Sequence, residues 1–211
     1  MFKKIALLSF LFTGSAIFSS AQNFGGIISF NKQSGSVPVN CVYYVKGDKV
    51  RFDEFKPGTK TAAESFIMDI KANTMIFIDP ARKLFGTQKQ VGTSAAAAGA
   101  IAAPTKTIKD ILGYKCTEQV VKNMSDSLQI DFFLAPGKFA FFMPMVKLIN
   151  SHEKFSTYFF AMTVPEGSMP ILAIETDLKG VEKERMEVTK IESKVVADDV
   201  FAVPAGYTEM K

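Results

Sequence analysis

The chain has 211 residues, of which 47% are hydrophobic, and its formal net charge is +4 from 25 Lys and Arg against 21 Asp and Glu. The basic residues form no cluster of the kind that nucleic acid requires, so no nucleic-acid partner is expected. The length fits one domain, and 20 phenylalanines, 16 of them after residue 21, without a tryptophan indicate an unusually aromatic interior.

The N-terminus has the pattern of a secretory signal. Lys3 and Lys4 precede an apolar run over residues 5–18, and small residues follow up to Ala21. The run is shorter than the roughly 20 residues of a membrane span. We therefore expect a signal peptide at 1–21, cleaved after Ala21, and an exported, periplasmic protein without a transmembrane segment after cleavage.

Residues 22–211 are expected to form a single domain of short strands with alternating polarity. The first strands are 24–30 and a hairpin over 39–55, in which Gly47-Asp48 provides the positive φ of a tight turn. Further strands are predicted at 64–70, 74–79, 83–89, 113–122, 127–135, 158–164, 170–180 and 185–193.

Three segments depart from the strand pattern. The alanine-rich residues 91–104 contain almost no large side chain, which predicts a flexible or weakly helical loop. Residues 144–155 predict one short helix, with Pro144 in its first turn and Met145, Leu148 and Ile149 on one face. The last segment, 198–210, predicts a terminal turn that docks its phenylalanine and proline on the sheet.

These elements predict a mainly β protein. About ten strands with one short helix favour a large curled antiparallel sheet, a half-barrel whose concave face is partly covered. The alanine-rich loop would interrupt that sheet.

Catalytic chemistry is not expected. His152 is the only histidine, and no nucleophile or set of metal ligands accompanies it in the sequence. Asp198 and Asp199 are adjacent, so on an extended chain they would point to opposite faces. We therefore predict no enzyme, no metal site and no cofactor. Cys41 and Cys116 allow either a disulfide or two separate buried thiols.

The stretch FAFFMPM, residues 139–145, raises the main functional question. Its aromatic and thioether side chains either fill the protein's own core or line the mouth of a cavity for a lipid or another acylated ligand. On the second interpretation, the protein is a binding or carrier module. The alternative is a structural or interaction component of the envelope with a filled core and a protein partner. The candidate ligand contacts are Phe132, Phe139, Phe141, Phe142, Met143 and Met145.

Four stretches carry a resemblance to a known family. They are FGGIISF, VKGDKVRFDEF, TIKDILGYKCTEQVV and RMEVTKIESKVVADDVFAVPAGYTEM. Together they resemble an uncharacterised family of exported bacterial proteins, a domain of unknown function common in Gram-negative envelopes. Its strand order is similar to that of the lipoprotein carriers LolA and LolB, half-barrels closed by short helices. The resemblance implies a periplasmic half-barrel with a hydrophobic concave face.

Overall fold

The computed structural model describes residues 23–89, 95–149 and 154–210. The predicted signal peptide and His152 lie outside these residues.

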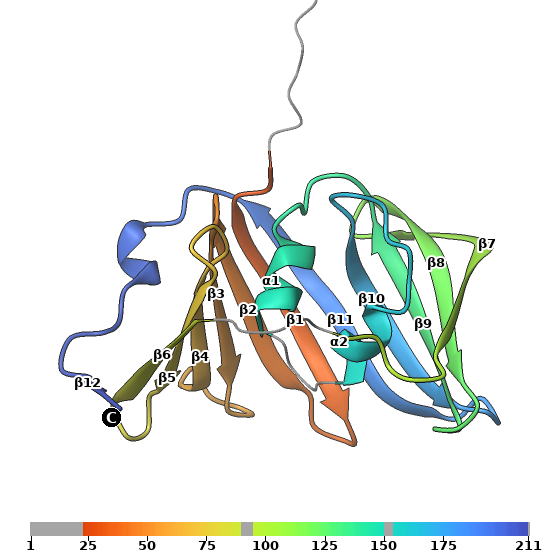
Figure 1. The fold of residues 1–211 in the computed structure, drawn as a ribbon, viewed down its shortest axis with the longest axis horizontal. Coiled ribbons are helices and arrows are strands. Elements are labelled where there is room, and N and C mark those ends of the chain that lie inside the picture. The colour runs from red at the N-terminus through yellow and green to blue at the C-terminus, as the bar shows by residue number, and fades with distance from the viewer. Residues whose placement is uncertain (1–22, 90–94, 150–153, 211) are drawn as a thin grey trace, which may run out of the picture.

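Within the described ranges, one mixed sheet of twelve strands forms the body of the protein, in the order β12-β6-β5-β4-β3-β2-β1-β11-β10-β9-β8-β7. The sheet is curled but not closed, because β12 and β7 at its two ends do not pair (Figure 1). This confirms the mainly β half-barrel, with two more strands than expected. The strands are β1 Gly26–Ser34, β2 Val39–Lys46, β3 Lys49–Phe55, β4 Ala62–Asp69, β5 Thr74–Asp79, β6 Leu84–Lys89, β7 Ile101–Ile111, β8 Tyr114–Asn123, β9 Leu128–Ala135, β10 Met169–Asp177, β11 Glu182–Ser193 and β12 Thr208–Glu209.

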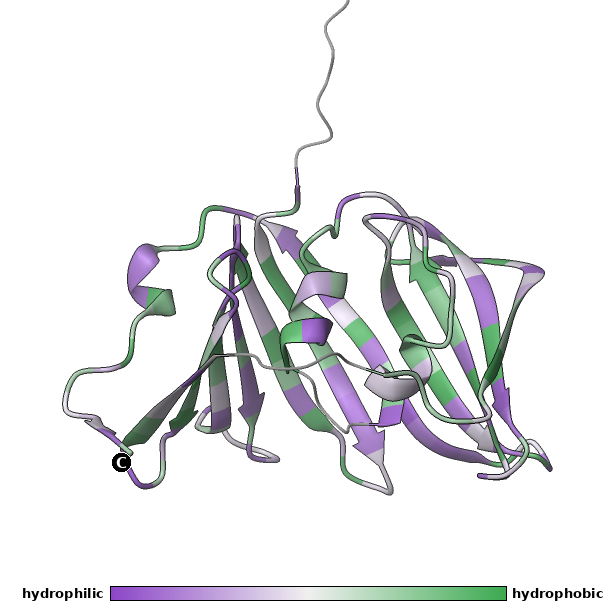
Figure 2. Cartoon of the chain, viewed as in Figure 1, coloured by the Kyte–Doolittle hydropathy of each residue, from purple (hydrophilic) through white to green (hydrophobic). Residues whose placement is uncertain are grey.

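Most neighbouring strands are joined by short hairpins, as the turn residues predict. Gly47 has a φ of 59°, the conformation expected of the predicted hairpin turn between β2 and β3. Three neighbouring pairs are not joined in this way: β1 with β11 at the centre of the sheet, β9 with β10, whose connection contains both α-helices, and β12 with β6 at one edge. Green and purple residues alternate along many of the strands in Figure 2, which is the pattern of a sheet with one buried face.

Two helices lie on the same face of the sheet (Figure 1). Helix α1, Phe142–Ile149, buries Phe142, Met145, Val146 and Leu148, and helix α2, Lys154–Phe159, buries Phe155, Tyr158 and Phe159. Pro144 lies in the first turn of α1, where a missing backbone N–H costs nothing. Within the described residues, neither helix is long and apolar enough to cross a membrane.

Two predictions about these segments are wrong. Residues 158–164 do not form a strand: α2 extends to Phe159, because Phe155, Tyr158 and Phe159 share one helical face toward the core. The alanine-rich loop is shorter than expected, since β7 begins at Ile101.

The described part of that alanine-rich segment is tied down by hydrogen bonds. The Ala97 amide donates to the Thr157 carbonyl at 3.1 Å, and the Asn123 side-chain amide donates to the Ala98 carbonyl at 2.9 Å. The small alanine side chains therefore allow this segment to pack closely against α2 and β8.

The C-terminal segment crosses the outer face of the sheet. A short 3-10 helix, η1 Asp198–Phe201, lies against β3, and the Arg51 guanidinium donates to the Val200 carbonyl at 3.1 Å. Asp198 forms an ion pair with Lys46 at 2.8 Å. The segment therefore docks on the sheet as predicted, with Phe201 half-buried, but Pro204 is exposed and does not take part. The docked segment explains why Ser65 and Ile67 are buried on the outer face of β4.

Candidate functional site

The six candidate ligand contacts lie in the core. Phe132, Phe139, Phe141, Phe142 and Met145 are buried, and Met143 is half-buried. The expectation that residues 139–145 line a mouth assumed an extended backbone, on which neighbouring side chains alternate. The segment instead enters a turn and then α1, so the alternation of an extended strand does not apply, and the neighbours Phe141 and Phe142 are both buried.

A continuous aromatic cluster fills this part of the molecule. The ring centroid of Phe139 lies 5.6 Å from that of Phe24 and 5.7 Å from that of Tyr114. On the other side, Phe142 and Phe159 are 5.4 Å apart, and Phe159 and Phe132 are 5.9 Å apart. The packing is that of an interior, which agrees with the interpretation of the stretch as the protein's own core.

Polar side chains fix α2 to the sheet beneath this cluster. The Tyr158 hydroxyl donates to a carboxylate oxygen of Asp126, and the Asn123 amide donates to the Tyr158 oxygen at 3.1 Å. Burial, and then the Asp126 carboxylate, raise the pKa of Tyr158 to about 12. Lys154 at the start of α2 donates to the buried Glu175 carboxylate at 2.9 Å. These contacts hold the helix in place over β8 to β10.

The concave face of β1 to β5 is different, because its aromatic side chains are only partly covered. Phe30, Tyr43, Phe52, Phe66 and Phe77, here called the aromatic row, follow one another from strand to strand. Their successive ring centroids are 4.7, 5.5, 6.0 and 5.3 Å apart. Phe30 is buried, while the other four are half-buried.

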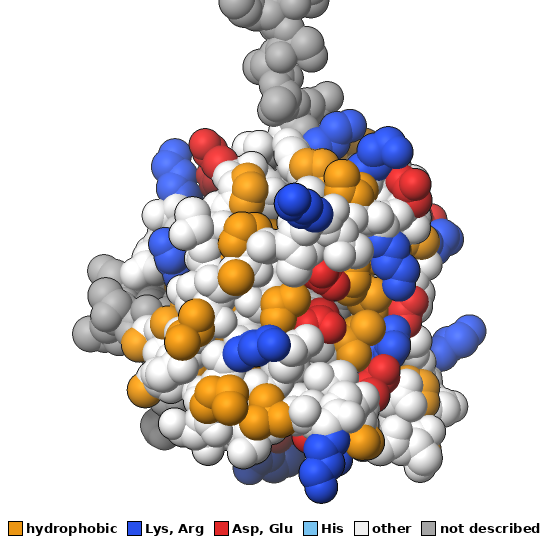
Figure 3. All heavy atoms as spheres, turned by 90° about the vertical axis from the view of Figure 1, so that its right-hand side faces the viewer, with side chains coloured by type: hydrophobic (Ala, Val, Ile, Leu, Met, Phe, Trp, Pro, Cys, Tyr) orange, Lys and Arg blue, Asp and Glu red, His pale blue; other side chains and the backbone are white. Residues whose placement is uncertain are grey.

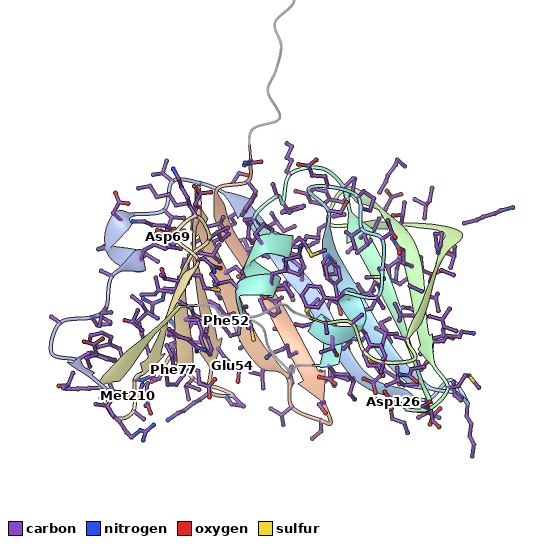
Figure 4. The ribbon with its side chains drawn as sticks, in the orientation of Figure 1. Phe52, Glu54, Asp69, Phe77, Asp126 and Met210 are labelled. Carbon is purple, nitrogen blue, oxygen red and sulfur yellow. The ribbon has the colours of Figure 1, made fainter. Side chains whose placement is uncertain are left out.

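Strand pairing produces the row. Tyr43 lies opposite Phe52, Phe52 opposite Phe66, and Phe66 opposite Phe77. Directly opposed residues of antiparallel strands point to the same face, so four aromatic side chains from four strands line up across the sheet. In Figure 4, Phe52 and Phe77 lie in that order toward the β12 end of the sheet.

A pocket of about 330 Å³ opens over the row. The volume is at the lower end of the range typical of ligand pockets. Ile149, at the end of α1, and Met186 of β11 close its sides. The pocket is lined by Phe30, Lys32, Tyr43, Phe52, Glu54, Glu64, Phe66, Ile149 and Met186.

Charged residues form one rim of this pocket. The Lys32 ammonium lies 2.9 Å from a Glu54 carboxylate oxygen and 5.7 Å from the Phe52 ring centroid, a cation–π arrangement. Glu64 lies opposite Glu54 on the next strand and is exposed. The pocket therefore has aromatic side chains at its base and one cation and two carboxylates at one rim. This arrangement suits a ligand with an apolar body and a polar end.

The two cysteines lie far apart. Cys41 in β2 and Cys116 in β8 are both buried and form no disulfide, and four strands separate them in the sheet. At about 4.8 Å per strand, this spacing exceeds the reach of a disulfide. The alternative of two separate thiols is the one that the structure supports. Burial raises the pKa of the Cys116 thiol.

Sequence reasoning did not identify the aromatic row, although the sequence contains a signal for it. Residues at equal distances from a hairpin turn pair with each other. Counting outward from the turns would have matched Tyr43 with Phe52 and Phe66 with Phe77. It would have missed the pairing of Phe52 with Phe66, because the register of β3 and β4 shifts by one residue between Glu54 and Phe55.

Three solved structures are similar to the chain in fold. An uncharacterized conserved protein from Thermus thermophilus has a TM-score of 0.53 and 8% identity, over 88% of this chain and 90% of that one. MucB has a TM-score of 0.47 and 10% identity, over 89% of this chain and 60% of that one. A putative outer membrane lipoprotein-sorting protein domain from Vibrio parahaemolyticus has a TM-score of 0.33 and 8% identity, over 83% of this chain and 88% of that one.

No curated protein matches the chain. A family model matches residues 24–207, which include all of the sheet except its last strand. The LolA-like half-barrel architecture expected from the sequence resemblance agrees with the curled, unclosed sheet. The chain belongs to the family described as a domain of unknown function, DUF4412.

Proposed function

We propose that the protein is an exported, non-enzymatic binding or carrier module that holds a lipid or another acylated ligand on its concave face. The observation that supports this most directly is the pocket of about 330 Å³ above half-buried aromatic side chains. Four aromatic rings left partly exposed in a row cost hydrophobic stabilisation that a bound apolar chain would restore.

The two interpretations of the aromatic residues apply to different halves of the molecule. The half under α1 and α2, which contains Phe132 and Phe139, is packed as an interior. The half formed by β1 to β5 retains the pocket. The proposed ligand contacts are therefore those of the aromatic row, and residues 139–145 support them by holding α1 in place.

The charged residues at the rim of the pocket favour a particular kind of head group on the ligand. Lys32 is already paired with Glu54, and Glu64 adds a further negative charge. A free carboxylate would meet repulsion there, whereas a zwitterionic or neutral head group would not. We therefore expect lysophosphatidylcholine to bind better than a fatty acid of the same chain length.

Binding of the neutral dye Nile red, followed by its fluorescence and by displacement with lysophosphatidylcholine, tests the proposal. Phe52→Ala removes the central ring of the row, and its affinity for the dye should fall about tenfold, equivalent to about 1.4 kcal/mol. Phe160→Ala is the matched control, because Phe160 is also half-buried but lies outside the row, just after α2.

Two results would contradict the proposal. One is that the wild-type protein does not bind the dye, or that lysophosphatidylcholine does not displace the bound dye. The other is an equal loss of dye affinity in Phe52→Ala and Phe160→Ala, which would mean that the dye does not occupy the aromatic row.

An envelope protein partner is the second candidate, and the edge strand β7 favours it. Ile101 and Ile108 on this strand are 72% and 64% exposed. Figure 3 views this end of the molecule and shows apolar side chains interspersed with lysines and acidic residues. An extended segment of another protein can add to such an edge through main-chain hydrogen bonds.

A further inference from the structure

The aromatic row stops abruptly at the edge of the sheet. Phe77 in β5 lies opposite Gly86 in β6, the next strand. A side chain at position 86 would point to the same face as Phe77 and would continue the row. Glycine leaves that space to another part of the molecule.

The side chain of Met210 occupies the space. A Cβ atom added at Gly86 would meet the Met210 Cε at 2.9 Å, so this methyl group lies where the next member of the row would begin. Figure 4 shows Met210 beyond Phe77, at the β12 end of the sheet. A flexible thioether from the C-terminal segment thus stands at the end of the aromatic row.

Backbone contacts determine this placement. The Thr208 amide donates to the Lys83 carbonyl at 3.0 Å, and the Met210 amide donates to the Phe85 carbonyl at 2.7 Å. Strand β12 pairs with β6 in parallel over two residues only. Met210 is 38% exposed, so its side chain is held in position by a short pairing and not by burial on all sides.

We infer that the Met210 side chain limits the length of the apolar chain that can lie along the aromatic row. The inference rests on the proposed function and adds a chain-length specificity to it. Neighbouring strands are about 4.8 Å apart, so removing the Met210 side chain would lengthen the apolar path by about one strand spacing, from β5 onto β6. A longer acyl chain would then stay in contact with the sheet along its whole length.

The test is a series of lysophosphatidylcholines from octanoyl to stearoyl, each below its micelle concentration, competing with Nile red. For the wild type we expect affinity to rise with chain length and then to level off. Met210→Ala should move that plateau to longer chains. Met124→Ala is the matched control, because Met124 is 69% exposed and lies at the far end of the sheet, in the turn after β8.

A second variant provides a rescue. In the Met210→Ala background, Gly86→Leu returns an apolar side chain to the same space from β6, and the plateau should return to shorter chains. Gly86 does not have a positive φ, so the backbone accepts a side chain there.

The outcomes distinguish the inference from the proposed function. Wild-type protein that binds neither dye nor lipid overturns both. If the wild-type protein binds the series but Met210→Ala gives the same dependence of affinity on chain length, only the length limit set by Met210 is overturned. A plateau that moves equally in Met124→Ala also overturns it.

Discussion

Replacing Phe139 by alanine should destabilise the protein more than truncating a half-buried member of the aromatic row. Phe139 is 0% exposed, and its ring packs against Phe24, Tyr114 and Phe141 at centroid distances of 5.6, 5.7 and 6.5 Å. Removing a fully buried phenylalanine costs about 3–5 kcal/mol, because the cavity left behind adds to the lost transfer free energy. Surrounding rings cannot close that cavity without losing their own contacts, which places the expected loss toward the upper value.

Phe52→Ala is the comparison, since Phe52 is half-buried and borders a pocket that already exists. Its truncation should cost roughly 1–2 kcal/mol, about half the value of full burial. Urea unfolding measures both. With an m-value of about 2 kcal/mol/M, Phe139→Ala should lower the midpoint by about 1.5–2.5 M. Equal midpoint shifts for Phe139→Ala and Phe52→Ala would refute the division into a packed half and an open half.

Two further predictions concern the cysteines and Tyr158. Because Cys41 and Cys116 are not joined by a disulfide, reductant should leave the melting temperature unchanged, and unfolding without reductant should expose two thiols to labelling. An unfolded chain with no reactive thiol would show a bridge. The pKa of Tyr158 is raised from 10.0 to about 12, so the stability that this group contributes is present below pH 10 and is lost as the pH rises toward 12. Unfolding free energies of Tyr158→Phe should fall less over this range than those of the wild type, and parallel curves would contradict the assignment.

The sequence predicted the fold where local signals were strong. Polar–apolar alternation and turn residues such as Gly47 were sufficient for most strands, and the first turn of α1 followed from Pro144. Strand β7 was missed because its N-terminal part, from Ile101, is alanine-rich and lacks large side chains that would show a period of two. The wrong strand at 158–164 reflects a short apolar run, for which periodicity alone does not separate helix from strand.

The site was harder to predict because its residues do not adjoin in the chain. Residues 139–145 stand out in the sequence by their aromatic density, and such density proved to mark the core. The aromatic row contributes one residue per strand, and only the register between strands assembles it. Met210 illustrates the difficulty further, since nothing near it in the sequence connects it with Gly86.

The central position of β1 has a consequence for how the chain folds. Gly26, almost the first described residue, pairs with Ser193, near the end of the chain, while the hairpins on either side involve close neighbours. Apart from the two-residue pairing of β12 with β6, the other neighbouring strands are much closer in sequence than β1 and β11. The β1–β11 ladder that joins the two halves therefore has a very high contact order, and we expect it to form late and slowly in folding. A chain that crosses a membrane from its N-terminus would present β1 long before β11 emerges. During that interval the edge of β1 that faces β11 would be unpaired and open to pairing with other chains.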